Sequence, residues 1–294
     1  MSKRLKFIII LSITVFMEIT WALIYFSHSV GKPANNWWQV GMSASGIIFG
    51  IFGMLTAAKW NWLKSGVGRG IVLISAGVFM WGVGNAGWTY YLFADPNQQN
   101  PPAHILDILY SSAIPLWFAG VVMLSRATGA RYGLRRLRGK LFVAFIILLM
   151  SVVSWYLLVD VARGGASYFK EPFWNQFFDL GYSIGDAIIA TVSIAIYGLS
   201  WKLLGGRFKL PILAILGGFV ILYFADFLYS YLAGKNEYFN GDVADLLYMT
   251  TISALGLSAT MLDPGHLSKT STLVAEVTSA NPILPPSGAG QGVT

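Results

Sequence analysis

Six acidic residues lie within or at the edges of long apolar stretches, where carboxylates are rare. They are Glu18, Asp107, Asp179, Asp186, Asp226 and Asp245. An ionised carboxylate surrounded by hydrocarbon is strongly destabilising unless it is hydrated, hydrogen-bonded or neutralised by a cation or a proton. The chemistry that these residues suggest is therefore the binding of a proton, a metal ion or a cationic small ligand, and the identity of any metal stays open.

The spacing of polar residues predicts that several of these acids share helix faces with hydroxyl and aromatic side chains. Residues at i, i+3, i+4 and i+7 lie on one side of a helix. Three stripes follow this rule: Asp179, Tyr182, Ser183 and Asp186; Tyr223, Asp226 and Ser230; Thr14, Glu18, Trp21 and Tyr25. We expect the stripes to face one cavity. Its predicted members are Glu18, Trp21, Trp88, Tyr182, Ser183, Asp186, Tyr223 and Asp226, with Trp81 and Trp155 as further walls and Asp107, Asp179 and Asp245 at the mouth.

The same acids have a structural alternative, in which they bond neighbouring helices to one another. Such bonds contribute about 0.6 kcal/mol each on average in membrane proteins. Asp107 and Asp245 begin predicted helices, where a carboxylate caps backbone N–H groups and meets the positive end of the helix dipole. We therefore expect these two to act as helix caps. For Glu18, Asp186 and Asp226 the binding role and the packing role both remain open.

The apolar stretches that carry these residues predict membrane spans. The chain has 294 residues, of which 55% are hydrophobic and 11% charged, against about 25% charged in ordinary soluble domains. A helix crosses the hydrocarbon core with about 20 residues. We therefore predict an all-α polytopic membrane protein with about eight transmembrane helices, in which glycines such as Gly46 and Gly82 allow close helix packing. The predicted spans are 6–26, 38–58, 71–93, 105–125, 141–161, 177–198, 211–232 and 243–262.

The distribution of Lys and Arg predicts the orientation of these spans. Sixteen of the 20 basic residues fall at both ends and in alternate connections, at 3–6, 59–69, 126–140, 202–209 and 269, and four fall on the opposite side. Because basic residues favour cytoplasmic loops, we expect both termini in the cytoplasm of a multi-pass inner (plasma) membrane protein. The acids then lie in the outer halves of their helices. Basic clusters beside spans also argue against nucleic acid as a partner and leave the lipid bilayer as the expected one.

The two halves of the chain resemble each other. Residues 107–110, Asp-Ile-Leu-Tyr, match 245–248, Asp-Leu-Leu-Tyr, at an offset of 138, and 37–43 match 177–183 at an offset of 140. These matches predict two tandem four-helix repeats related by an axis along the membrane normal. We assign 1–140 and 141–263 to the repeats, and 264–294, rich in Pro, Gly and small polar residues, to a disordered cytoplasmic tail.

The sequence lacks the motifs of common catalytic and cofactor sites. It contains no cysteine, and therefore no disulfide, thiolate metal site or thiol nucleophile. It also lacks a P-loop, a Rossmann glycine pattern, a Gly-x-Ser-x-Gly elbow and a His-Glu-x-x-His motif. We therefore expect no cofactor, and the sequence does not favour an enzyme.

The second half of the chain resembles a known kind of membrane domain. The segments concerned are Phe177-Phe-Asp-Leu-Gly-Tyr-Ser-Ile-Gly-Asp186, Leu216-Gly-Gly-Phe219, Tyr223-Phe-Ala-Asp226-Phe-Leu-Tyr229 and Asp245-Leu-Leu-Tyr248. They are similar to the multi-helix membrane sensor regions that precede diguanylate cyclase, phosphodiesterase or histidine kinase domains in bacteria. Ser183 and Ile184 stand where that family has proline and leucine, and no output domain follows the eighth span. The resemblance implies a sensory role that is exerted through a separate cytoplasmic signalling partner.

Two functions from different classes are therefore expected. The first is a sensor-like or ligand-binding membrane module with an outward-facing pocket of acids and aromatic rings, whose partner docks on the basic loop 126–140. The alternative is a transporter of a cation or a small solute, with Asp186 and Asp226 as coupling carboxylates. Because polar residues are scarce in the inner halves of the spans, the sequence favours the first.

Overall fold

The chain forms a bundle of long helices, seen here in a computed structural model that describes residues 2–27, 33–94, 103–127, 130–165, 173–201 and 208–264. The long helices are α1 (Lys3–Phe26), α2 (Pro33–Ala58), α3 (Gly66–Ala94), α4 (Ala103–Ala127), α6 (Leu137–Ser154), α7 (Phe173–Ser200), α8 (Lys209–Gly234) and α9 (Val243–Met261). The short elements are η1 (Trp62–Lys64) and α5 (Ala130–Leu134), and α6 continues without a break into a π-helical stretch, η2 (Trp155–Val161). No strand occurs among the described residues.

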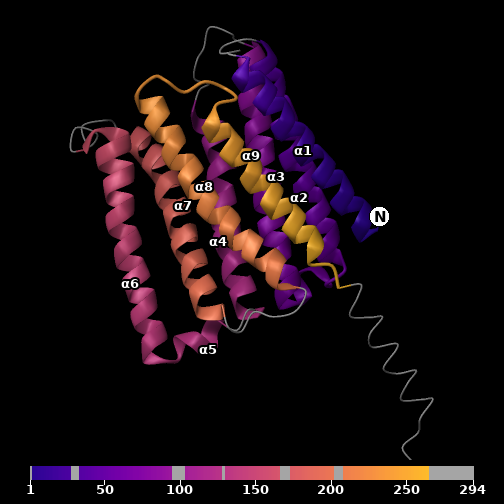
Figure 1. Ribbon diagram of the computed structural model, residues 1–294, viewed down its shortest axis with the longest axis vertical. Coiled ribbons are helices and arrows are strands. Elements are labelled where there is room, and N and C mark those ends of the chain that lie inside the picture. The colour runs from indigo at the N-terminus through magenta and orange to yellow at the C-terminus, as the bar shows by residue number, and fades with distance from the viewer. Residues whose placement is uncertain are drawn as a thin grey trace, which may run out of the picture.

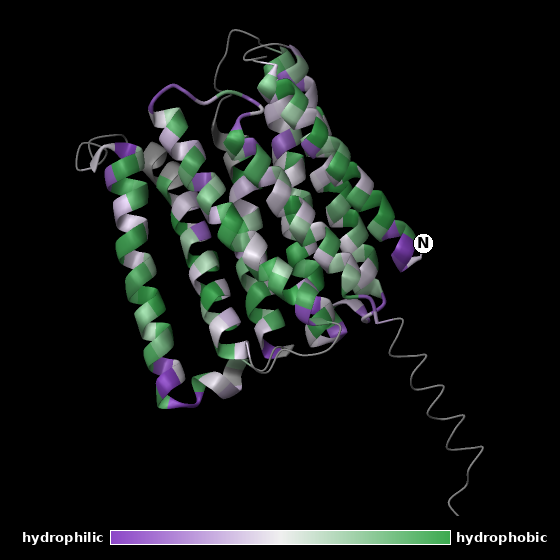
Figure 2. Ribbon diagram, in the orientation of Figure 1, coloured by the Kyte–Doolittle hydropathy of each residue, from purple (hydrophilic) through white to green (hydrophobic). Residues whose placement is uncertain are grey.

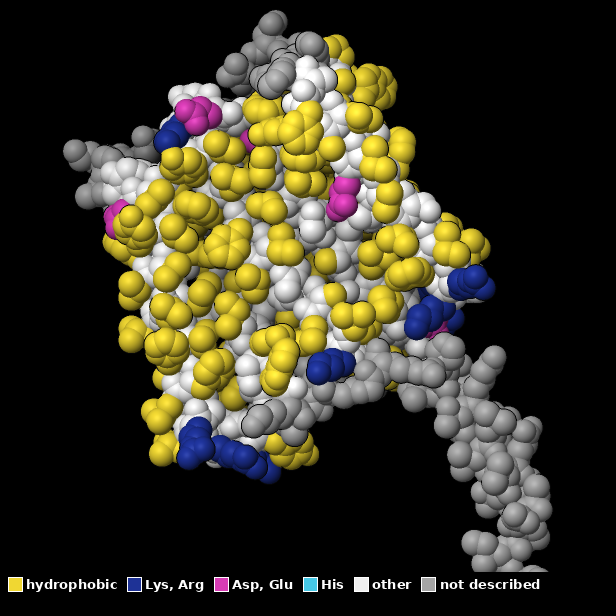
Figure 3. All heavy atoms as spheres, in the orientation of Figure 1, with side chains coloured by type: hydrophobic (Ala, Val, Ile, Leu, Met, Phe, Trp, Pro, Cys, Tyr) yellow, Lys and Arg dark blue, Asp and Glu magenta, His cyan; other side chains and the backbone are white. Residues whose placement is uncertain are grey.

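Eight helices of the described chain are long and apolar enough to cross a membrane. Each coincides with one of the predicted spans, and their ends differ from the prediction by a few residues. The prediction of an all-α, multi-pass membrane protein is therefore confirmed. Hydrophilic residues gather at the helix ends and in the connections (Figure 2), and hydrophobic side chains cover the middle of the face drawn in Figure 3, with most of its Lys and Arg toward the end that holds the N-terminus.

The helices lie in two layers (Figure 1). One layer contains α6, α7, α8, α9 and α1, each packed on the next, and the other contains α4, α3 and α2 in the same way. Helix α9 also packs on α2 and α3, and α7 packs on α4. Because α9 touches both layers, residues of α9 can meet side chains from either half of the chain.

The helix contacts of the two halves correspond in part. The contacts of α2 with α3, of α3 with α4 and of α4 with α7 have counterparts in those of α7 with α8, α8 with α9 and α9 with α2. The first helices of the two halves differ, since α1 packs on α9 whereas α6 packs mainly on α7. Much of α6 consequently faces outward, with Leu141, Phe145, Leu148 and Val152 all more than half exposed and available to lipid.

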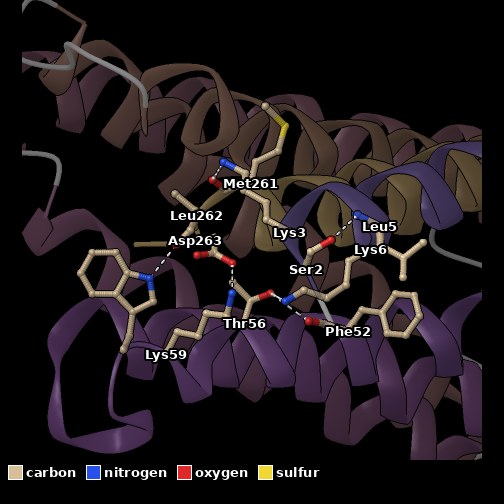
Figure 4. Close-up of polar contacts among 11 residues, drawn as sticks. Ser2, Lys3, Leu5, Lys6, Phe52, Thr56, Lys59, Met261, Leu262 and Asp263 are labelled. Atoms are coloured by element: carbon tan, nitrogen blue, oxygen red, sulfur yellow. Dashed lines mark hydrogen bonds and ion pairs between the residues drawn. The ribbon is translucent and has the colours of Figure 1, made fainter. Parts of the chain in front are cut away.

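Both ends of the described chain lie at the same end of the bundle, where polar contacts join α1, α2 and the residues after α9 (Figure 4). The Nζ of Lys3 donates to the carbonyl of Met261 at 3.0 Å, and the carboxylate of Asp263 pairs with Lys59 at 2.7 Å. The fully buried Lys6 donates to Thr56 Oγ1 at 2.5 Å. These contacts fix the C-terminal end of α9 relative to the first two helices, and we call this end of the bundle the termini end.

The ion pair at the termini end yields a first prediction. Asp263 is almost fully buried, whereas the Lys59 side chain is 41% exposed. Lys59→Met removes the cation beside a buried carboxylate, so we expect it to lower the free energy of unfolding by about 1–3 kcal/mol. Asp263→Asn leaves an ammonium that water can solvate, so its cost should be less than about 1 kcal/mol. Equilibrium unfolding in mixed micelles measures both, and a larger loss for Asp263→Asn would contradict this assignment of burial.

Candidate functional site

A cavity of about 340 Å³ lies in the half of the bundle opposite the termini end. Its walls come from α2, α3, α4, α7, α8, α9 and the connection between α8 and α9. The acids that line it are Asp186, Asp226 and Asp245. The aromatic residues that line it are Trp81, Trp88, Trp117, Tyr110, Tyr182, Tyr229, Tyr238 and Tyr248. Both halves of the chain thus contribute to one site.

The innermost charged feature of the cavity is a pair of carboxyl groups on neighbouring helices. Asp186 of α7 is 4% exposed, and its carboxyl is hydrogen-bonded to that of Asp226 on α8. A hydrogen bond between two carboxyl groups requires a proton on at least one of them, so the pair carries at most one negative charge. Asp226 Oδ1 accepts a 2.5 Å hydrogen bond from the Tyr248 hydroxyl, whereas Asp186 Oδ1 has no partner among the described residues. One buried acceptor of a residue that lines the cavity therefore has no partner in this part of the chain.

Asp245, the third acid, is held by several donors. Its Oδ2 accepts hydrogen bonds from Gln39 Nε2 at 2.5 Å and from the backbone N–H of Gly241 at 2.6 Å. The Tyr238 hydroxyl donates to the same carboxylate at 3.2 Å. Burial, and after it the charge of Asp245, raise the pKa of Tyr238, so the hydroxyl keeps the proton that it donates. Asp245 therefore joins α2, α9 and the loop before α9.

The expected helix cap at the start of α9 is corrected by the structure. The N-cap residue is Asp242, whose side chain accepts from the backbone N–H groups of Ala244 and Asp245. Asp245 lies in the first turn, and its carboxylate accepts a hydrogen bond from the backbone N–H of Gly241, which precedes the helix. The sequence held the signal for this cap, since Asp242 directly precedes the predicted span 243–262.

Neutral polar residues that the sequence analysis missed support the cavity from α2 and α3. Asn85 donates to Ser43 Oγ at 2.8 Å and accepts from the Tyr110 hydroxyl at 3.3 Å. The same amide contacts Gln39 Oε1 at 3.4 Å, which links this network to Asp245. Uncharged amides inside membrane spans commonly hydrogen-bond between helices, and this was the signal in the sequence that could have identified Gln39 and Asn85.

A cation that the sequence analysis did not include in the site, Arg163, also lies beside the cavity. The Arg163 guanidinium follows the π-helical stretch η2 and donates to Ser183 Oγ at 3.0 Å and to Ser230 Oγ at 3.2 Å. It donates as well to the carbonyl of Leu158 at 2.8 Å. Because Ser183 and Ser230 both line the cavity, Arg163 joins α7 and α8 close to it.

The structure brings some predicted site residues together and separates others. Asp186, Asp226, Asp245, Tyr182, Ser183, Trp81 and Trp88 line the cavity. Trp21 does not, and its Nε1 donates to the backbone carbonyl of Asp242 at 3.0 Å. The Tyr223 hydroxyl pairs with Ser154 Oγ at 3.0 Å, and its ring packs in a separate cluster.

Two more predicted residues lie away from the cavity, and two cannot be placed. Glu18 is partly exposed on α1, and it is not among the residues that line the cavity. Trp155 is 58% exposed. It borders a smaller apolar depression that lies between α7 and the continuous helix formed by α6 and η2. The side chains of Asp107 and Asp179 lie outside the described residues, as do residues 265–294 of the predicted tail.

The burial of Asp242 predicts a pH dependence of stability. Burial raises the pKa of its carboxyl from 3.8 to about 6, although the capping N–H groups act in the opposite direction. Between these values the folded protein binds the proton more tightly than the unfolded chain, so this group makes stability fall as pH rises from about 4 to 6. Asp242→Asn keeps a capping oxygen and removes the charge. We expect it to be more stable than the wild type by about 2–3 kcal/mol at pH 7 and equally stable at pH 4.

Melting curves between pH 4 and 7.5 test this prediction, with the exposed Asp160 changed to Asn as a control. Asp160→Asn should keep the wild-type profile, because Asp160 belongs to η2 and takes no part in the cap of α9. An Asp242→Asn variant that is less stable than the wild type at pH 7 would show that the ionised cap is favourable.

The described residues offer no clear metal site. No group of three or more His, Cys, Asp or Glu side chains in this part of the chain is placed to hold a metal ion. The chain matches no protein-family model, and no curated protein or solved structure is similar to it. The function is therefore argued from the cavity itself.

Proposed function

We propose that this protein is a sensor-like membrane module that binds a small ligand in the cavity between its two halves and passes the signal to a cytoplasmic partner. The single observation that carries this proposal is the cavity with an unpaired, buried acceptor, Asp186 Oδ1. Its volume of about 340 Å³ is that of a small-molecule site. A wall made mainly of aromatic and aliphatic side chains with a few placed polar groups is also typical of such sites.

The orientation proposed for this module places the cavity toward the outside of an inner (plasma) membrane. Both ends of the described chain and the described part of the basic segment 126–140 lie at the end of the bundle opposite the cavity (Figure 1). The excess of Lys and Arg at the termini end supports a cytoplasmic position for that end. A ligand would then reach the cavity from the outer side.

Helix α9 supplies a physical connection between the cavity and the cytoplasmic side. Near its first turns, Asp245 and Tyr248 line the cavity. At the other end of the helix, Met261 and the adjacent Asp263 are held by Lys3 and Lys59. A ligand that moves the first turns of α9 would therefore act on the termini end, where a partner would dock. The resemblance of residues 177–262 to bacterial sensor regions supports the same role.

The packing below the cavity favours binding over transport. Between the cavity and the termini end the bundle is filled by the fully buried apolar side chains of Ile74, Ile189, Phe219 and Leu255. A solute on its way through would have to open this core, which is closely packed and costly to disturb. We therefore propose a binding module rather than a transporter.

Ligand-dependent stability of the detergent-purified protein tests this proposal. A ligand at 100 times its Kd stabilises the folded state by about 2.7 kcal/mol, which is readily seen as a rise in Tm. We expect at least one compound in a panel of small amines, acids, sugars and metal ions to raise the Tm of wild type and of Glu18→Gln, but not that of Asp186→Asn. Glu18→Gln is the matched control because it neutralises an acid that does not line the cavity.

Two results would contradict the proposal. If no compound raises the Tm of wild type, or if every rise persists in Asp186→Asn, the cavity is not the binding site. Uptake of the identified ligand into vesicles that contain the protein would instead support the transporter alternative, with Asp186 and Asp226 in the path.

A further inference from the structure

We propose that the ligand is a small organic ion with one ammonium group, which is held by Asp186 and packed against tryptophan and tyrosine rings. This inference rests on the binding function proposed above and names the class of its ligand. It follows from the charge of the cavity, from the number of free acceptors and from the nature of the walls.

The charge of the cavity favours a cation with a single charge. Its lining contains three aspartates and no Lys or Arg among the described residues. Two of these aspartates, Asp186 and Asp226, are hydrogen-bonded to each other and so carry at most one negative charge between them. The third, Asp245, is already bonded to Gln39 and to Gly241 N. The carboxyl pair therefore provides the site for one positive charge.

The number of free acceptors supports the same conclusion. Asp226 accepts from Tyr248, and Asp186 Oδ1 is the buried acceptor without a partner among the described residues that line the cavity. A single acceptor orients a single ammonium nitrogen. The Arg163 guanidinium, which bonds to the lining residues Ser183 and Ser230, would repel a second positive charge nearby. A monoamine should therefore bind more tightly than a diamine of similar length.

The walls favour an organic cation over a metal ion. Eight of the lining residues are Trp or Tyr, and the ring of Trp81 lies 5.9 Å from that of Tyr248 and 6.2 Å from that of Tyr110. The faces of such rings attract ammonium groups and their alkyl substituents, most strongly where water is excluded. A divalent ion instead requires several oxygen ligands around one point, and the described side chains do not supply such a group.

Calorimetric titration of the full-length protein in detergent with chosen probes tests the inference. The probes are choline, its uncharged carbon isostere 3,3-dimethylbutan-1-ol, butylamine, 1,4-diaminobutane and magnesium chloride. We expect saturable binding of choline or butylamine, with Kd at least about tenfold lower than for the uncharged isostere, the diamine or Mg²⁺. Asp186→Asn should weaken ammonium binding by at least about tenfold, while Glu18→Gln should leave it unchanged.

A second variant keeps the test informative if Asp186→Asn does not fold. Trp88→Leu leaves all three acids in place and should also weaken ammonium binding by about tenfold, whereas Trp88→Phe should lose less. Binding of the uncharged isostere or of Mg²⁺ as tight as that of the ammonium probes would overturn the inference. If none of these probes binds but another small compound raises the Tm through Asp186, the ligand class is wrong and the proposed binding function stands. If no compound of any class binds, both fail.

Discussion

Gly82→Val is expected to prevent the membrane domain from reaching its folded state. A Cβ atom added at position 82 would lie 2.6 Å from the backbone nitrogen of Ile47 and 2.8 Å from the carbonyl carbon of Gly46. These are main-chain atoms of α2, so a side-chain rotation cannot relieve the overlap, and α2 and α3 must move apart. Overpacking in a core usually costs about 1–3 kcal/mol, and we expect more than about 3 kcal/mol here because two backbones are forced apart.

The consequences of Gly82→Val should extend to the cavity. Asn85, one helical turn further along α3, hydrogen-bonds to Ser43 of α2 and contacts Gln39. A shift of α3 away from α2 would break these contacts and leave buried amides without partners. The measurement is the yield of monodisperse protein in detergent, together with its Tm.

The matched control for this prediction is a glycine in a spacious position. A Cβ at Gly217 of α8 would meet nothing within 4 Å, so Gly217→Ala should be neutral or raise stability by about 1 kcal/mol through its higher helix propensity. Gly82→Ala should fall between the two variants. A Gly82→Val protein with a wild-type yield and Tm would contradict the close crossing of α2 and α3.

The spans and the close-packing glycines could be predicted from the sequence because both follow from local properties. Twenty apolar residues in a row satisfy the membrane wherever their neighbours lie. Gly46 and Gly82 were predicted to be packing positions for a similar reason, since small residues let helix backbones approach each other. The structure places Gly46 directly against Gly82. The assignment of Asp186 to one helix face with Tyr182 and Ser183, and of Asp226 to one face with Ser230, relied on helical periodicity in the same way.

The remainder of the site depends on which helices pack against each other and through which faces. The periodicity of a single helix does not predict this. Tyr223 belongs to the stripe of Asp226, yet its hydroxyl meets Ser154 on α6. Trp155 was predicted as a wall of the cavity, but it begins a π-helical stretch, and a wider helical turn changes the direction of the side chains that follow. Arg163, two residues beyond the predicted span 141–161, was not among the predicted site residues for the same reason, because the packing of α6 on α7 brings it to Ser183.

The second prediction with a large effect concerns the donors that converge on Asp245. Asp245→Ala would leave the Gln39 amide and the Gly241 N–H without the acceptor that they use now, and it would remove the acceptor of the Tyr238 hydroxyl. A buried donor that loses its partner costs about 1–3 kcal/mol. Since relaxation of the loop recovers part of this, we expect a total loss of about 3–5 kcal/mol. Equilibrium unfolding of wild type and variant in mixed micelles gives the value.

A double-mutant cycle with Tyr238→Phe distinguishes lost hydrogen bonds from a general loosening of the loop. Tyr238→Phe removes one donor and keeps the ring that packs 4.7 Å from Tyr229, so it should cost only about 1 kcal/mol. In the Asp245→Ala background the same change should cost nothing or be favourable, because the unpaired hydroxyl is then removed as well. A coupling of about 1 kcal/mol or more supports this account. If the two losses of stability are additive, the contribution of the Tyr238 hydroxyl does not depend on Asp245. The α8–α9 connection is then held against the cavity by its other contacts, such as the hydrogen bond from Trp88 Nε1 to Asn240.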